Sequence, residues 1–106
     1  MDISEFQQRA SDLFEQLQDG LDRYQDDLDY EFGHAKLVIQ ALTKPDVYVV
    51  NTQQAAFQMW MAGQAKAWHF DWDEQREDWY DAKNKIGIHE ALSTCLSQLC
   101  GKAITL

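Results

Sequence analysis

The segment FQMWMAGQAKAWHFDW, residues 57–72, decides the fold class. Large apolar side chains occupy every second position in both halves of it, which is the period of a β-strand with one buried and one exposed face. Ala62-Gly63-Gln64 separates the two halves and is typical of a turn. We therefore expect two consecutive strands, Phe57–Met61 and Trp68–Trp72, paired antiparallel.

The same period of two continues on both sides of this hairpin. Before it, Lys44-Pro45-Asp46 marks a further turn. Because all the connections are short, the strands should form an antiparallel meander. The sequence predicts about six strands. Besides the two above, they are Asp29–Phe32, Lys36–Ala41, Val47–Val50 and Asp78–Tyr80.

Helical periodicity of the apolar residues marks both ends of the chain. The first helix is expected from Ser4 to Tyr24, with Ser4 and Gln7 as a capping box. The second is expected from Ile88 to Leu99, closed by Gly101. The order helix, strands, helix predicts a single domain over residues 1–106: an α+β, two-layer α-β sandwich. Both helices should pack on one face of the antiparallel sheet and leave the other face open.

Composition narrows the possible partners. The chain has 106 residues and a formal net charge of -9, which disfavours binding to nucleic acid or to an anionic membrane. No apolar run approaches the roughly 18 residues of a membrane span, and the N-terminus lacks the pattern of a signal peptide, so we expect a cytoplasmic protein. Cys95 and Cys100 would point about 140° apart on a helix and are expected to be reduced.

The negative charge is concentrated near the N-terminus. Residues 2–31 hold ten acidic residues against two arginines, a local net charge of -8, and the remainder is nearly neutral. Five acids, Asp12, Glu15, Asp19, Asp22 and Asp26, recur at intervals of three and four along one face of the expected helix. They are either a solvated face that also protects a sheet edge, or a row of oxygen ligands for cations such as Fe²⁺, Mn²⁺ or Ca²⁺. An EF-hand loop and a zinc quartet are both absent from the sequence.

Alternation places Trp60 on the open face of the sheet. Phe57, Met59 and Met61 should face the core, whereas Trp60 should lie beside His69 of the next strand. An exposed tryptophan is a common anchor for a protein partner, although Trp60 could equally be half-covered by its neighbours. His69 and Asp71 point the same way, but no nucleophile is placed beside them, which argues against catalysis.

Several segments resemble the frataxin family, most of all its bacterial members. They are Asn51-Thr52-Gln53, Gln58-Met59-Trp60-Met61-Ala62, His69-Phe70-Asp71-Trp72 and Ile88-His89-Glu90-Ala91-Leu92. The resemblance implies an α-β sandwich that binds iron (Fe²⁺/Fe³⁺) weakly and acts in iron-sulfur cluster assembly. The expected partners are a cysteine desulfurase and the iron-sulfur scaffold protein, with a monomeric state in the absence of metal.

The resemblance also assigns two sets of site residues. The metal-binding set, called the acidic ridge below, comprises Asp19, Asp22, Asp26, Asp27, Asp29 and Glu31. The partner-binding set on the open face comprises Asn51, Gln53, Gln58, Trp60 and His69.

Two functions follow from these sets. The first is a non-enzymatic, iron-binding regulator or adaptor that acts on the desulfurase and scaffold complex. The alternative is an iron oxidase or iron storage protein that uses the same carboxylates. A diiron oxidase needs clustered ligands such as Glu-x-x-His pairs, and the first helix contains no histidine, so the sequence favours the regulator.

Overall fold

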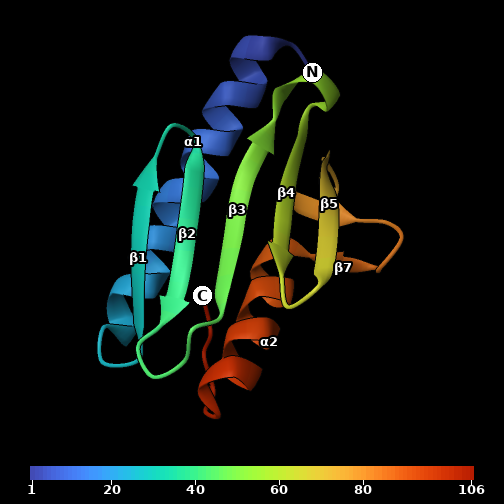
Figure 1. Ribbon diagram of the computed structural model, residues 1–106. Coiled ribbons are helices and arrows are strands. Elements are labelled where there is room, and N and C mark those ends of the chain that lie inside the picture. The colour runs from blue at the N-terminus through green and yellow to red at the C-terminus, as the bar shows by residue number, and fades with distance from the viewer.

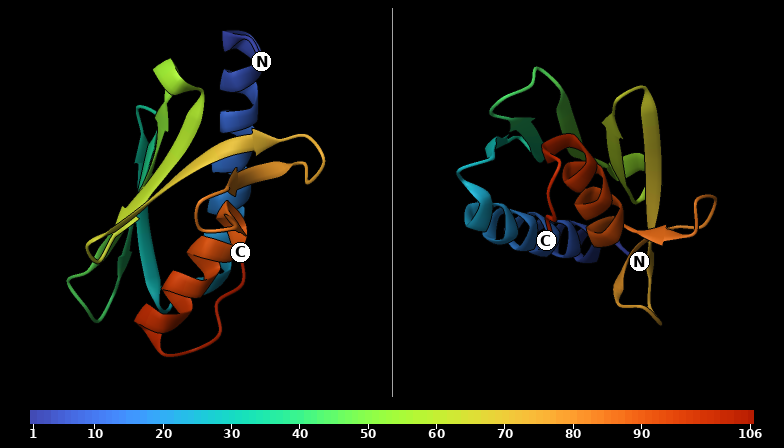
Figure 2. Two further views of the ribbon diagram at one scale, coloured as in Figure 1. Left: turned by 90° about the vertical axis from the view of Figure 1, so that its right-hand side faces the viewer. Right: turned by 90° about the horizontal axis from the view of Figure 1, so that it is seen from below.

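Two helices from opposite ends of the chain lie on one face of a twisted antiparallel sheet (Figures 1 and 2). The computed structural model describes residues 1–106, and the seven strands lie in sheet order β1 to β7. The elements are α1 (Ile3–Leu21), the 3-10 turn η1 (Asp22–Tyr24), β1 (Leu28–Gly33), β2 (Lys36–Ala41), β3 (Val47–Gln53), the 3-10 turn η2 (Gln54–Ala56), β4 (Gln58–Gly63), β5 (Lys66–Asp73), β6 (Asp78–Asp81), β7 (Ile86–Gly87) and α2 (Ile88–Cys100).

The predicted two-layer sandwich is confirmed, with one additional strand. β7 is only two residues long, too short to show any alternation in the sequence. It pairs with β6 and leads directly into α2. β1 and β7 are the two edges of the sheet, so Asp29 and Glu31 of β1 lie on an edge strand.

The ends of α1 differ from the sequence prediction. Asp2, rather than Ser4, caps the helix: its carboxylate accepts a hydrogen bond of 2.8 Å from the backbone N–H of Glu5. The helix also ends at Leu21, because Asp22–Tyr24 tighten into a 3-10 turn. α2 ends where predicted, on Gly101 with a φ of 67°.

The core lies between the helices and the inner face of the sheet. It contains 23 buried apolar residues, among them Met59, Met61 and Phe70 of the hairpin that decides the fold. Phe57 was expected to join Met59 and Met61, but that expectation is wrong. Its backbone is left-handed (φ 52°) and it precedes β4, so its ring is 38% exposed and packs on Phe6 at a centroid distance of 5.6 Å.

The C-terminal segment closes the layer of helices. It runs back between α1 and α2 (Figure 2), where Ile104 is 3% exposed. Its backbone N–H donates to Ser97 Oγ at 2.8 Å, and Arg23 donates to the carbonyl oxygen of Thr105 at 2.6 Å. Both cysteines are free, as expected. Neither helix combines the length and the apolar character that a membrane span requires.

Candidate functional site

The predicted partner-binding residues lie together on the open face of the sheet. The strand register places Asn51, Trp60 and His69 opposite one another in one row across β3, β4 and β5. The neighbouring row consists of Gln53, Gln58 and Asp71. The partner-binding set predicted from the sequence does not include Asp71. Asp71 is two residues from His69 on the same strand, so the alternation of the strand places both on this face. We call these six residues the open-face patch.

Side-chain contacts tie the patch into one unit. The rings of Trp60 and His69 stack at a centroid distance of 4.4 Å, with 22° between their planes. Trp60 Nε1 donates to Gln58 Oε1 at 2.9 Å, and Gln58 Nε2 donates to Asp71 Oδ1 at 3.1 Å. Trp60 is thus on the open face, as predicted, and half-buried beneath its neighbours. It presents a flat aromatic surface surrounded by amide and carboxylate groups.

The acidic ridge follows the β1 edge of the molecule and occupies both sides of it. Asp19 lies on α1, Asp22 in η1, and Asp26 and Asp27 in the turn before β1. Because Leu28 and Tyr30 of β1 face the helices, the alternate residues Asp29 and Glu31 point to the open side of the sheet. The predicted single row along one helix face therefore ends with α1, and the ridge bends around the edge strand instead.

Two ridge carboxylates have side-chain partners within the chain, and Asp29 Oδ1 accepts a local hydrogen bond of 2.9 Å from the backbone N–H of Tyr30. Tyr30 donates its hydroxyl to Asp22 Oδ1 at 2.7 Å, and Lys102 Nζ lies 2.9 Å from Asp27 Oδ2. The hydrogen bond to Asp22 raises the pKa of Tyr30, and burial and the charges of Asp22 and Asp19 raise it further. The hydrogen bond to Asp27 and its charge likewise raise the pKa of Lys102. Both shifts reflect the negative potential of the ridge.

The remaining ridge acids, Asp19, Asp26, Asp29 and Glu31, are exposed and take part in no ion pair. Nowhere in the chain do three or more His, Cys, Asp or Glu side chains gather into a group that could hold a metal ion. The ridge therefore offers separate, hydrated oxygen ligands. Such ligands suit hard cations but bind them weakly, because no protein cage replaces the water around the ion.

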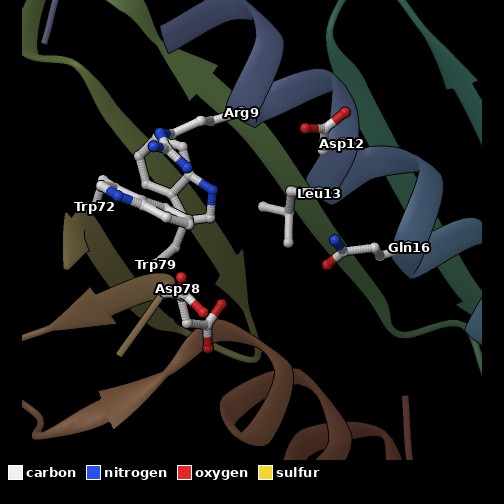
Figure 3. A pocket seen from close by; sticks show the side chains of 8 residues that line it. Arg9, Asp12, Leu13, Gln16, Trp72, Asp78 and Trp79 are labelled. Atoms are coloured by element: carbon white, nitrogen blue, oxygen red, sulfur yellow. The ribbon is translucent and has the colours of Figure 1, made fainter. Parts of the chain in front are cut away.

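Two hollows flank α1, and one of them borders the ridge. One, of about 270 Å³, lies between α1 and β1 and is lined by Asp19, Asp22 and Tyr30 of the ridge region. The other, of about 180 Å³, lies between α1 and the β5-β6 hairpin (Figure 3). There the guanidinium group of Arg9 lies 4.1 Å from the centre of the Trp72 ring. This second hollow is on the helical side of the sheet and contains no residue of the ridge or the patch.

Comparison with known proteins agrees with this fold. The family model described as "Frataxin-like domain" matches residues 1–102. The "Iron-sulfur cluster assembly protein CyaY" of Dechloromonas aromatica is 31% identical over 106 residues, covering 100% of this chain and 99% of that protein. The protein of the same name from Bordetella avium is 32% identical over 101 residues, covering 89% and 91%.

Solved structures show the same architecture. A frataxin from Psychromonas ingrahamii superposes with a TM-score of 0.89 at 22% identity and covers 99% of this chain and 97% of its own. Trimeric frataxin from the yeast Saccharomyces cerevisiae has a TM-score of 0.74 at 22% identity, covering 89% and 80%. These likenesses establish the fold, and the family model spans nearly the whole sequence. The chain therefore belongs to the frataxin family.

Proposed function

We propose that this protein is a non-enzymatic, iron-binding regulator of iron-sulfur cluster assembly. Relatives that match the whole chain carry the name iron-sulfur cluster assembly protein. The acidic ridge would contact a cysteine desulfurase, and the open-face patch would contact the scaffold protein. An adaptor that brings two proteins together requires two separate surfaces of this kind.

The distribution of charge carries this proposal. Residues 2–31 hold a net charge of -8 out of the -9 of the whole chain, and the ridge places much of it along one edge. Like charges this close cost helix stability and oppose the α1 dipole at its C-terminal end, where no basic residue compensates. A basic protein surface or a cation offsets that repulsion, which favours a binding role for the ridge.

The ridge suits iron as a passing cargo. Its ligands are carboxylate oxygens, the donors that Fe²⁺ and Fe³⁺ accept readily, and they are exposed and separate. Because the same carboxylates would meet the desulfurase, each bound iron ion would cancel negative charge and weaken that electrostatic contact. Iron loading and docking would thereby be linked.

The alternative, an iron oxidase or iron storage protein, fits the geometry less well. A diiron centre needs carboxylates and histidines that converge on one point. Here Asp19 and Asp22 lie on the helical side of the edge strand, whereas Asp29 and Glu31 point to its other side. Because these carboxylates do not converge on one point, the geometry favours the regulator over the oxidase or storage protein.

Charge reversal on the ridge tests the proposal. The double variant Asp22→Lys with Asp26→Lys should lower the affinity for purified cysteine desulfurase by about tenfold or more at low salt, and the difference should shrink at high salt. Glu74→Lys with Glu77→Lys in the β5-β6 turn makes the same change in net charge away from the ridge. Equal losses in the two double variants would remove ridge docking as the mechanism.

A further inference from the structure

Asp81, at the end of β6, is the one buried charged residue of the protein, with 4% of its surface exposed. It forms no ion pair. Its carboxylate instead accepts three hydrogen bonds: from the backbone N–H of His69 at 3.1 Å, from the backbone N–H of Asn84 at 2.9 Å, and from Asn84 Nδ2 at 2.8 Å. One of these donors belongs to the open-face patch.

The sheet explains why His69 needs this acceptor. β5 and β6 pair from Asp73 opposite Asp78 to Asp71 opposite Tyr80, and their pairing ends there. The next residue of β6, Asp81, pairs with Ile86 of β7. The backbone N–H of His69 therefore has no strand carbonyl opposite it, and a backbone N–H needs an acceptor. The Asp81 carboxylate takes the place of the missing strand.

The direction of this hydrogen bond also shows how His69 pairs with Trp60. An N–H that points toward β6 cannot point toward β4, so His69 and Trp60 form a non-hydrogen-bonded pair in the β4-β5 ladder. In such pairs the Cα atoms lie about 4.5 Å apart, closer than in hydrogen-bonded pairs, and the side chains approach one another. The two rings accordingly meet at 4.4 Å.

We propose that Asp81 is a positioning residue of the open-face patch: by holding the backbone of His69 from the β6 side, it keeps the His69 ring stacked on Trp60 in the form that a partner protein meets. This inference rests on the proposed function, in that the patch is taken to be a partner surface. His69 N–H and Asn84 Nδ2 both donate to Oδ2 of Asp81, and the backbone N–H of Asn84 donates to Oδ1. An asparagine could keep the bond to His69 by turning its amide oxygen to the Oδ2 position, whereas alanine removes the acceptor altogether. Burial by itself would raise the pKa of the Asp81 carboxyl group, but the hydrogen bonds from Asn84 and His69 outweigh it and hold that pKa below its ordinary value.

Asp81→Ala in the full-length chain tests the inference, with Asn84→Ala as the matched control. Asn84→Ala removes one hydrogen bond from the same carboxylate but leaves the bond to His69. In Asp81→Ala we expect amide hydrogen exchange at His69 to become about tenfold faster. We also expect the His69 ring protons to lose the upfield NMR shift that the stacked indole causes. Unchanged exchange and ring shifts, or equal changes in Asn84→Ala, would overturn the inference.

A measurement on the unmodified chain covers the case in which Asp81→Ala does not fold. The amide proton of His69 should follow the ionisation of Asp81, monitored at the Asp81 side-chain carboxyl carbon during an acid titration by NMR. A His69 amide signal that is indifferent to the ionisation of Asp81 would contradict the hydrogen bond and with it the proposal.

Affinity measurements separate this inference from the proposed function. Asp81→Ala and Trp60→Ala should both weaken binding to the purified scaffold protein, and Asn84→Ala should not. If Trp60→Ala leaves binding unchanged, the proposed role of the patch is wrong, whatever the NMR shows. If Trp60→Ala weakens binding and Asp81→Ala does not, the positioning role of Asp81 is wrong.

Discussion

The indole of Trp60 and the imidazole of His69 stack at 4.4 Å on the solvent side of two adjoining strands. Gln58 accepts a hydrogen bond from Trp60 and donates one to Asp71, so polar groups adjoin the apolar surface of the pair. A flat and preorganised aromatic surface of this kind loses little conformational entropy when a partner covers it.

Trp60→Ala should leave the fold nearly as stable as before. The side chain lies outside the core, so we expect the free energy of unfolding to fall by only about 1 kcal/mol. Trp79→Ala is the matched control, because Trp79 is 1% exposed and lies in the core, and its loss should cost about 3–5 kcal/mol. Urea unfolding of both variants measures the difference; similar losses would show that Trp60 is a core residue.

Lys102→Ala should strengthen binding of divalent cations to the ridge. Lys102 pairs with Asp27 and therefore competes with any cation that approaches this carboxylate. We expect Fe²⁺ or Co²⁺ to bind roughly twofold more tightly in the variant, with the first NMR shifts between Asp19 and Glu31.

Lys83→Ala is the control for that titration, because it removes the same charge from the exposed β6-β7 turn. Equal gains in the two variants would indicate a general effect of net charge. First shifts at His69 or Cys95 would contradict a cation site on the ridge.

Gly63→Ala should destabilise the protein by about 1–3 kcal/mol through overpacking. A Cβ atom at this position would lie 2.2 Å from Cδ1 of Tyr48, a buried residue that has little room to move. Gly33→Ala is the control, because a Cβ atom there meets nothing within 4 Å. Thermal unfolding of the two variants should differ clearly, and equal melting temperatures would contradict the close packing of β4 on Tyr48.

Ala65→Gly should stabilise the protein by about 1 kcal/mol. Gln64 and Ala65 form the tight turn between β4 and β5 with φ values of 50° and 63°. This left-handed conformation is energetically unfavourable for any residue that has a side chain. Ala62→Gly in the neighbouring strand should have the opposite sign, because Ala62 does not have a positive φ and glycine only adds flexibility there. Urea unfolding checks both signs.

Much of the candidate site could be predicted from the sequence because it depends on alternation alone. Once Met59 and Met61 face the core, Trp60 must face outward, and the short connection to β5 brings His69 beside it. The errors concern local choices that alternation does not control. The helix is capped by Asp2 and not by the predicted Ser4, and the left-handed backbone of Phe57 removed it from the strand.

The sequence by itself determined the two layers, the antiparallel order of the strands and the concentration of acid near the N-terminus, because periodicity and charge are local properties. Tertiary structure alone decided which groups meet across the chain: Lys102 with Asp27, Arg9 with Trp72, and Asp81 with His69. It also decided that the ridge bends around β1. These features depend on the twist of the sheet and on where each strand pairing stops, which are set by the packing of the whole core.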